Sequence, residues 1–324
     1  MTLAEARAIG GSYDLDVVAI DALSAGSVNS NFRVSAASGE AFFLRVYEEQ
    51  NLEGAALELQ VIRELSESGV PTPPPRARRD GGYVTPHRGK PVGLHPWVEG
   101  DSLCFGRVTR HAVRHLGRAL ARVHRCGAAL SHVPEGRFGL QGLRERLDAV
   151  DRTDRRFAPD TIRIRERMAH YAACSSSALP QGLIHGDLFR DNVLWRGQPG
   201  ADQHGAGPEL VALLDFESAS QGVFVYDIMV CVHAWCYGAA FDLDLVRALL
   251  AGYHEERPLL TEELAALEAH GALAALRFAT TRLTDFSLRA PPGQPPARDY
   301  RRFLARLEAI EAGLLTPIIK EVMR

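Results

Sequence analysis

Apolar and polar residues alternate in two runs near the start of the chain, after a short leader with helical character. The runs span residues 30–35 and 41–47 and are rich in β-branched and aromatic side chains. A short Gly-containing segment separates them, which is the pattern of a β-hairpin. Apolar residues at helical spacing then predict a helix over residues 52–68, which Gly69 and Pro71 end.

A second pair of strand-like runs follows at residues 82–85 and 91–98, on either side of a His-Arg-Gly-Lys turn. This arrangement predicts a second hairpin. A Glu-Gly-Asp sequence then breaks the apolar pattern, and the chain is long enough for two units. The sequence therefore predicts an N-terminal lobe over residues 1–98 and a C-terminal lobe over residues 99–324.

The second lobe is predicted to be mainly helical. Residues 109–125 carry apolar positions on one helical face, and residues 137–173 are charged and helical in pieces. Two short apolar runs, 193–195 and 210–214, are predicted strands around a Gly-rich excursion. From residue 223 onward the pattern is helical, apart from a proline-rich insert near the end. A β-rich part followed by a helical part predicts an α+β fold.

Composition narrows the possible partners. An apolar fraction of 46% and a charged fraction of 24% are typical of a soluble globular protein. The net charge of −3 gives no basic surface, so we expect no nucleic-acid partner. Residues 223–240 are apolar but contain Asp227 and His233, which predicts a buried helix and no membrane partner. No basic segment followed by an apolar run opens the chain, so we expect a cytoplasmic protein.

The cysteines show no pattern of a metal site or a disulfide framework. No two are spaced as C-x-x-C, and their number is odd. We interpret them as small buried hydrophobic residues in a reducing compartment. They are Cys104, Cys126, Cys174, Cys231 and Cys236.

The sequence LIHGDLFRDNVLW at residues 183–195 carries the strongest chemical signal. Asp187 lies between an apolar run and a loop, and Asn192 follows five positions later. Asp215 comes twenty-three residues after Asn192, at the end of another apolar run. Mg²⁺ binds carboxylate and amide oxygens together with substrate phosphates. Asn192 and Asp215 are therefore candidate Mg²⁺ ligands.

Asp187 suits a different task in the same chemistry. In phosphoryl transfer one carboxylate orients the attacking hydroxyl, while metal ions neutralise the nucleotide phosphates. His185-Gly186-Asp187, Asn192 and then Asp215-Phe216-Glu217 match the spacing of the H-x-D-x-x-x-x-N and D-F-x patterns of kinases. Unrelated acidic loops often give one half of this pattern, but rarely both halves at this spacing.

These motifs resemble those of the aminoglycoside phosphotransferase and choline kinase superfamily, relatives of the protein kinases. From about residue 20 to 310 the chain resembles more narrowly the type II homoserine kinase family, although that family often has alanine where Gly186 stands. The resemblance implies a protein-kinase-like two-lobed fold, with a small β-rich N-lobe and a larger, mainly helical C-lobe, that binds ATP and Mg²⁺. The resembling segments are 26–32, 184–193, 226–230, 235–236, 277–278, 282–283 and 285–286.

The resemblance also implies a nucleotide site in the N-lobe. Protein kinases carry a lysine on their third strand, and Arg45 stands at the corresponding place, with Glu58 on the next helix as its expected partner. Strand alternation turns Arg45 inward, although a surface arginine would fit the same pattern. Neither a Walker nor a Rossmann motif occurs, so a Ser/Asn-rich hairpin is expected to meet the phosphates. The expected nucleotide contacts are Ser27, Asn29, Asn31, Arg45 and Glu58, with Pro96 and Val98 in the hinge between the lobes.

Four polar residues near these motifs have expected roles in or around the catalytic loop. We group His185 with Asp187 as a catalytic-loop residue and expect it to brace the loop by hydrogen bonds. Asp227 is expected to anchor the same loop from a buried position, and His124 to be a core histidine with satisfied hydrogen bonds. Glu217 is a candidate metal ligand through water, or else a cap for the next turn.

Three classes of acceptor remain open: a hydroxylated amino acid, with L-homoserine favoured by the resemblance; an aminoglycoside, other antibiotic or choline-like or hydroxylysine-like amine; and a protein Ser/Thr residue. The third is disfavoured because no Ala-Pro-Glu motif and no activation segment follow Asp215. A small zwitterion needs both a cation and an anion. Arg277, Arg282 and Asp285 of the late segment, with Arg190 beside the catalytic loop, would supply them, whereas a salt-bridged surface helix would show the same late residues. The expected acceptor contacts are Arg190, Arg282 and Asp285. The expected partner is thus a small hydroxylated molecule, and the protein is a monomer or homodimer.

Overall fold

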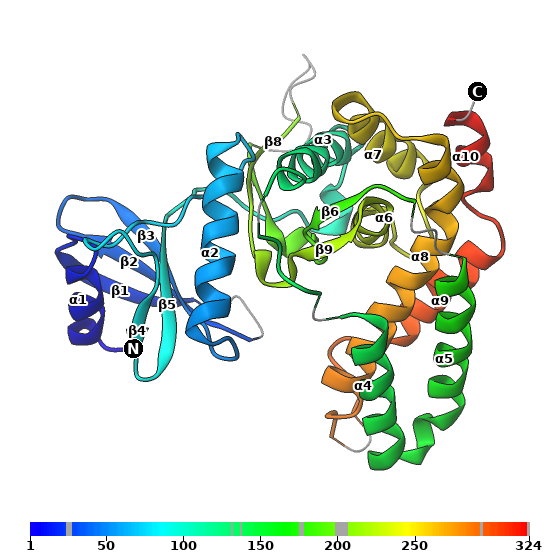
Figure 1. Cartoon of the computed structure of the whole chain (residues 1–324), viewed down its shortest axis with the longest axis horizontal. Helices are drawn as coiled ribbons and strands as arrows, with labels where there is room; N and C mark the ends of the chain where they lie inside the picture. The colour runs from blue at the N-terminus through cyan, green and yellow to red at the C-terminus, as the bar shows by residue number, and fades with distance from the viewer. Residues whose placement is uncertain are drawn as a thin grey trace.

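The fold is taken from a computed structural model that describes residues 1–23, 28–130, 132–136, 138–174, 178–197, 207–291 and 294–322. An antiparallel sheet with two helices forms the N-terminal part, and a larger helical part with two small sheets lies beside it (Figure 1). This arrangement confirms the α+β prediction. The lobe boundary at residue 98 stays a prediction.

The N-terminal sheet contains five antiparallel strands in the order β1-β2-β3-β5-β4. β2 and β3 form the first predicted hairpin, with Ser30 opposite Val46 and Ser35 opposite Ala41. β4 and β5 form the second, and β5 pairs with β3. The elements are α1 (Leu3–Gly11), β1 (Val17–Leu23), β2 (Ser30–Ala36), β3 (Ala41–Val46), α2 (Leu52–Glu67), β4 (Thr85–His87) and β5 (Lys90–Pro96).

The strands β1 and β9 were not predicted from the sequence. β1 lies at the edge of its sheet, and its Val18 is 46% exposed, so the regular alternation that identifies a half-buried strand is absent. β9 (Ser220–Val223) has only four residues and the sequence Ser-Gln-Gly-Val, which is poor in strand-forming side chains. It forms a strand because it pairs with β6 (Gln181–Ile184).

The helical part begins with α3 and surrounds the two small sheets. β7 pairs with β8 in one sheet, and β6 pairs with β9 in the other. Short turns connect several elements, and a π-helical turn over Leu283–Ser287 extends α8. The remaining elements are α3 (Arg110–Gly127), α4 (Leu140–Thr153), α5 (Ala158–Ala173), β7 (Val193–Arg196), β8 (Glu209–Leu213), α6 (Phe224–Trp235), α7 (Leu243–Glu256), α8 (Thr261–Arg282), α9 (Arg301–Glu311) and α10 (Thr316–Val322).

Helices α3 and α7 of this part pack in close contact. α3 and α7 approach closely at Gly117 and Gly252, where an added Cβ would collide with the backbone of the other helix. Nearly every residue of α6 is buried, which confirms the predicted buried helix. Among the described segments, no helix is both long and apolar enough to cross a bilayer.

A shared hydrophobic core joins the N-terminal part to the helical part. Leu59, Ile62 and Leu65 on α2 belong to the same buried cluster as the apolar faces of α3 and α6. A separate cluster lies between the sheet and α1. The sheet therefore rests on the helical part through α2, which sets its position over the loops that carry Asp187 and Asp215.

The prediction that all five cysteines are buried was wrong for three of them. Cys231 and Cys236 are buried in and just after α6, but Cys104 and Cys174 are exposed and Cys126 is partly exposed. Cys104 lies in a surface connection, whereas Cys126 and Cys174 lie at the ends of helices. All five are free thiols.

Candidate active site

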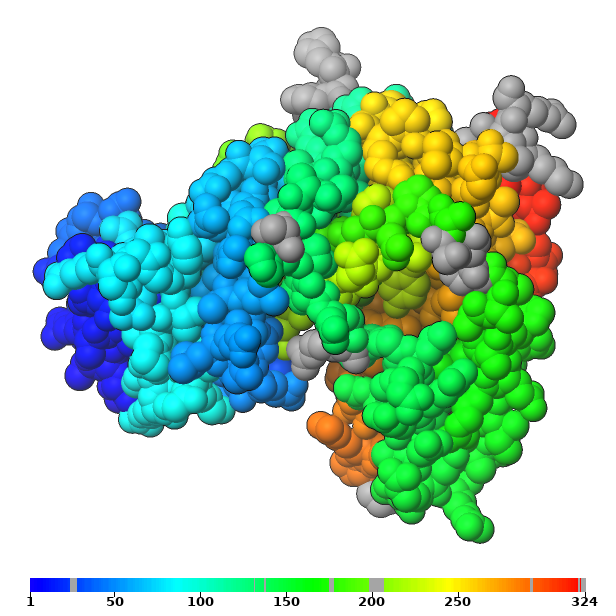
Figure 2. Space-filling model, viewed as in Figure 1, coloured from blue at the N-terminus to red at the C-terminus, as the bar shows by residue number. Residues whose placement is uncertain are grey.

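A cavity of about 410 Å³ lies between the N-terminal sheet and the helical part. In the space-filling view, the molecule is hollowed between the N-terminal part and the segment that contains α4 and α5 (Figure 2). The cavity walls come from β2 and β3, from the Asp187 and Asp215 loops, and from α4 and α8. Its lining includes Asn29, Asn31, Arg45, Arg146, Asp187, Asp215, Glu217, Arg277, Arg282 and Asp285.

A buried carboxylate holds the loop that carries Asp187. Asp227 on α6 is completely buried and accepts hydrogen bonds from the backbone N–H groups of His185 at 2.7 Å and Gly186 at 2.9 Å. Gly186 has φ +74°, and an added Cβ would lie 2.9 Å from the Ser218 carbonyl oxygen. Glycine is favoured here because a side chain would strain both the backbone and the contact.

Asp227 also meets the core histidine predicted from the sequence. The His124 Nε2 atom lies 3.1 Å from Asp227 Oδ2, and its Nδ1 atom lies 2.7 Å from the Tyr253 hydroxyl. Burial raises the pKa of Asp227, but the bonds from His124 and from the loop backbone outweigh burial and hold it below its usual range. The anchor is therefore an ionised carboxylate with hydrogen bonds on both oxygens.

Asp227→Asn is expected to lower the free energy of unfolding by about 1–3 kcal/mol, because the amide group cannot accept all three hydrogen bonds and leaves a buried donor unpaired. Urea unfolding near neutral pH measures the change. Asp242→Asn is the matched control, since Asp242 caps α7 and asparagine caps helices about as well as aspartate. An Asp227→Asn protein as stable as the control would contradict the anchoring role.

His185 braces the loop from below the cavity. Its Nε2 atom lies 2.9 Å from the Leu214 carbonyl oxygen, and its Nδ1 atom lies 3.4 Å from the backbone nitrogen of Asp187. Its ring also contacts Phe216, with the ring centroids 4.6 Å apart. His185 is buried and is not among the residues described as lining the cavity. Its contacts join the Asp187 loop to the Asp215 loop, and a catalytic role stays a prediction.

A hairpin brings Asn192 and Asp215 together. β7 and β8 pair with Val193 opposite Leu213, and the Leu214 N–H group donates to the Asn192 carbonyl oxygen at 2.9 Å. Asp215 follows β8 in a left-handed conformation, with φ 64° and ψ 68°. Aspartate and asparagine adopt this conformation more readily than most residues. The side chain of Asp215 lines the cavity, whereas Asn192 lies just beside the described lining.

The oxygen atoms at this hairpin suit Mg²⁺ that arrives with a phosphate-bearing substrate. The Asn192 Nδ2 atom donates to the Asp187 carbonyl oxygen at 2.8 Å, and its Oδ1 atom has no hydrogen-bond partner within the described part of the chain. No group of three His, Cys, Asp or Glu side chains among the described residues could hold a metal. Mg²⁺ often takes only one or two protein oxygens, with water and phosphate oxygens as its other ligands. Asn192 and Asp215 meet that requirement.

Arg45 extends inward from β3 toward Asp215. Its Nη1 atom lies 3.0 Å from Asp215 Oδ1 and 3.8 Å from Glu58 Oε1, and its Nε atom donates to Asn31 Oδ1 at 3.3 Å. Burial raises the pKa of Glu58 to about 7, although the Arg45 guanidinium opposes this effect. The expected contact between Arg45 and Glu58 is thus present, while its role in nucleotide binding stays a prediction.

The other predicted nucleotide residues are divided between the cavity and its surroundings. Asn29 and Asn31 line the cavity. The Asn29 Nδ2 atom donates to Glu217 Oε2 at 2.8 Å, so the hairpin touches the loop that follows Asp215. Ser27 lies outside the described residues. Pro96 ends β5 and Val98 follows it, and neither is part of the described lining.

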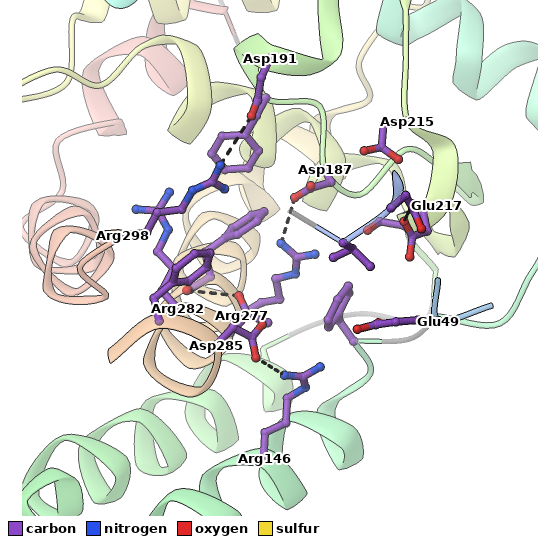
Figure 3. A pocket seen from close by; sticks show the side chains of 18 of the residues that line it. Glu49, Arg146, Asp187, Asp191, Asp215, Glu217, Arg277, Arg282, Asp285 and Arg298 are labelled. Atoms are coloured by element: carbon purple, nitrogen blue, oxygen red, sulfur yellow. Dashed lines mark hydrogen bonds and ion pairs between the residues drawn. The ribbon is translucent and has the colours of Figure 1, made fainter. Parts of the chain in front are cut away.

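Arg277 belongs to the charge pattern expected to favour a zwitterion, but its contact with Asp187 was not predicted. Its Nη1 atom lies 3.2 Å from Asp187 Oδ1, and its guanidinium stands 4.1 Å from the ring centroid of Phe138 and 3.9 Å from that of Phe278. Figure 3 shows Arg277 directed at Asp187 from the helix below. A buried arginine within the apolar stretch of α8 is unusual, and this was the signal available in the sequence.

Two of the three predicted acceptor residues line the cavity. Asp285, in the π-helical turn, accepts a hydrogen bond from Arg146 at 3.0 Å (Figure 3). The Arg282 guanidinium carbon lies 4.4 Å from the ring centroid of Phe303. Arg190, the third, is not part of the described lining, and its guanidinium lies 5.5 Å from the ring centroid of Phe105. A part for Arg190 in acceptor binding stays a prediction.

Comparison with known proteins agrees with this geometry. Residues 19–259 match the phosphotransferase enzyme family. A homoserine kinase from Mesorhizobium japonicum is 32% identical over 297 residues, which cover 90% of this chain and 88% of the relative.

Solved structures show the same fold at low sequence identity. An amicoumacin kinase in complex with AMP-PNP, Ca²⁺ and Ami superposes with a TM-score of 0.69 and 16% identity, covering 95% of this chain and 93% of that one. A microcompartment-associated aminopropanol kinase superposes with a TM-score of 0.68 and 17% identity, covering 97% and 98%. The family match and the homoserine kinase relative together establish that the chain belongs to the phosphotransferase enzyme family, as a small-molecule kinase that transfers phosphate to a hydroxyl group.

Proposed function

We propose that this kinase phosphorylates the side-chain hydroxyl of L-homoserine, with ATP as the phosphate donor and Mg²⁺ as the metal. The observation that carries the proposal is the balanced charge of the cavity. Among the residues described as lining it, six are arginines and six are aspartates or glutamates. A carboxylate and an ammonium group on one small molecule require both kinds of partner.

The same balance disfavours an aminoglycoside acceptor. Aminoglycosides are polycations, so their sites need an excess of acidic side chains, and arginines at the wall would repel them. Here Arg146, Arg277, Arg282 and Arg298 lie on the acceptor side of Asp187 (Figure 3). The sequence relatives named homoserine kinases support the amino-acid acceptor independently of the charge argument.

In this proposal Asp187 orients the acceptor hydroxyl and accepts its proton as the phosphoryl group is transferred. Arg277 positions the carboxylate through the hydrogen bond to Oδ1. Asn29, Asn31 and Arg45 contact the nucleotide, and Asn192, Asp215 and, through water, Glu217 hold the metal. When bound, Mg²⁺ neutralises charge on the phosphates. We also propose a cytoplasmic protein with lobes at residues 1–98 and 99–324.

The direct test is ADP release by the purified protein with Mg²⁺-ATP and a panel of acceptors. The panel contains L-homoserine, L-threonine, L-serine, hydroxylysine, choline, ethanolamine, 3-aminopropan-1-ol and kanamycin. Saturable turnover with L-homoserine, well above that with the other acceptors, is expected. Turnover with kanamycin or choline alone would retain the phosphotransferase chemistry and overturn the proposed acceptor.

Arg277→Met is expected to shift the pH dependence of turnover to higher pH. Desolvation raises the pKa of Asp187, and the Arg277 guanidinium acts against it. Without that cation the pKa of Asp187 rises further, so a smaller fraction of the carboxylate is ionised as the pH falls. The loss in kcat/KM should therefore be larger near pH 6 than near pH 9, as a profile across this range measures.

Arg289→Met is the matched control, because Arg289 is an exposed arginine of the same cavity. Arg277→Lys should return the profile toward that of the wild type, since it restores a cation near Asp187. A uniform loss at every pH, with an unchanged profile, would show that Arg277 supports the structure without tuning Asp187.

A further inference from the structure

Four arginines from three segments of the chain lie near the Arg282 wall of the cavity. We call Arg190, Arg282, Arg302 and Arg306 the arginine cluster. Arg282 and Arg306 share one aromatic ring, with their guanidinium carbons 4.4 Å and 4.1 Å from the centroid of Phe303. Arg302 lies one helical turn before Arg306 on α9, and the positive charges of Arg190, Arg282 and Arg302 each lower the pKa of Arg306.

Arg306 has the most unusual surroundings of the four. It lies on α9, is only 6% exposed, and stacks on Tyr237 at 4.4 Å as well as on Phe303. Its buried Nε and Nη1 atoms have no hydrogen-bond partner in the described structure. Burial, followed by the neighbouring arginines, lowers its pKa to about 9. At neutral pH it is thus a buried cation with two donor atoms that have no partner among the described residues.

No carboxylate neutralises the cluster. None of its four members forms an ion pair with a residue that the structure describes. Asp191 raises the pKa of Arg190 and Asp187 raises that of Arg282, but neither acid forms an ion pair with these arginines. Each already has another arginine as its partner, Arg298 at 3.7 Å and Arg277 at 3.2 Å respectively.

Without a bound anion, this arrangement lowers the stability of the folded protein. Arg302 and Arg306 are four residues apart on α9, a spacing at which like charges repel. A buried charge without a partner adds a desolvation cost. Both costs are removed when an anion binds, because guanidinium groups form paired, charge-assisted hydrogen bonds with carboxylate and phosphate oxygens.

We propose that the arginine cluster is a binding site for a small oxyanion, a carboxylate or a phosphate, at the edge of the acceptor cavity. Arg282 belongs to both the cluster and the cavity wall, so the bound anion lies next to the acceptor. It is either the carboxylate of the acceptor itself, a reading that rests on the proposed function, or a free anion beside the acceptor. Arg302 and Arg306 become binding residues in both cases.

Binding is tested first without any turnover. Thermal unfolding is followed with increasing inorganic phosphate at constant ionic strength, for the wild type, Arg306→Met and the control Arg301→Met. Arg301 neighbours Arg302 on α9 but pairs with Asp299 at 3.7 Å. Phosphate should stabilise the wild type and the control, whereas in Arg306→Met the apparent Kd should rise at least about tenfold.

The phosphate-free samples provide a second criterion. Arg306→Met should be as stable as the wild type or more stable, because it removes an unpaired buried charge and nearly preserves side-chain volume. A purely structural role for the stacked arginine predicts the opposite, a lower Tm at every phosphate concentration. That result, with the same phosphate dependence in all three proteins, would overturn the proposal.

Kinetics then identify the source of the anion. 3-Aminopropan-1-ol is L-homoserine without its carboxylate, so it isolates the contribution of that group. If the acceptor carboxylate occupies the cluster, Arg306→Met raises KM for L-homoserine by about tenfold or more, leaves 3-aminopropan-1-ol unaffected, and phosphate competes with L-homoserine. If a free anion occupies it, both KM values are unchanged and phosphate does not compete. Failure of L-homoserine as a substrate would leave the thermal result intact.

Discussion

Asp187→Asn is expected to reduce kcat by about 10²–10⁴-fold, the usual contribution of a general base. Asparagine has nearly the same shape and retains an oxygen that can accept the hydrogen bond from Arg277, but it cannot take the proton of the acceptor hydroxyl. Because Asp227 and His185 hold the loop through its backbone, the fold should be preserved. Steady-state ADP release with the preferred acceptor measures the loss, and urea unfolding verifies the fold.

Asp191→Asn is the control for this prediction. Asp191 lies four residues later on the same loop, also lines the cavity, and pairs with Arg298. We expect its kcat to stay within about tenfold of the wild type, because a surface ion pair contributes little. An Asp187→Asn protein that matched the Asp191→Asn control would remove Asp187 from the reaction.

Asp215→Asn should weaken metal binding and reduce kcat/KM by roughly 10²–10³-fold. Phosphoryl transfer depends strongly on neutralisation of the phosphate charge by the metal. The amide oxygen is a weaker Mg²⁺ ligand than a carboxylate. Asparagine tolerates the left-handed backbone at this position and can still accept the hydrogen bond from Arg45. The distinguishing measurement is the Mg²⁺ concentration at half-maximal activity, which should rise.

Glu217→Gln provides the comparison for that experiment. Glu217 lies two residues after Asp215 and is contacted by Asn29, and its expected part is a ligand through water. The Mg²⁺ concentration at half-maximal activity should therefore rise less in Glu217→Gln than in Asp215→Asn. If Asp215→Asn lost activity with an unchanged Mg²⁺ dependence, Asp215 would act on the nucleotide or on Arg45 and not on the metal.

Much of the fold could be predicted because its elements carry local signals. The hairpin of β2 and β3 alternates along two runs with a turn between them, and α2 repeats apolar residues on one face before Gly69. The strands β1 and β9 carry no such signal. One is an exposed edge and the other is short and polar, so each becomes a strand only through its partner. Cysteine burial was also beyond local inference, since it depends on which segments reach the surface.

The candidate site was also predictable only in part. Asp187, Asn192 and Asp215 were found from spacing, because one loop and one hairpin place them near each other without help from distant segments. The pairing of Arg277 with Asp187 was not predicted, because the two residues are ninety positions apart in sequence and meet only when α8 packs against the loop. Arg190 was predicted at the acceptor from its position in the chain, and only the tertiary structure places its guanidinium beside Phe105.

The sequence by itself determined most of the helices and strands, the strand position of Arg45 and the identity of the acidic motifs. These depend on hydrogen bonding and side-chain periodicity over a few residues. Only the tertiary structure decided which charges meet. The Asp227 anchor, the pairing of Arg277 with Asp187 and the arginine cluster each join residues from separate elements. Their distances are set by how helices and sheets pack, and a one-dimensional pattern does not contain that information.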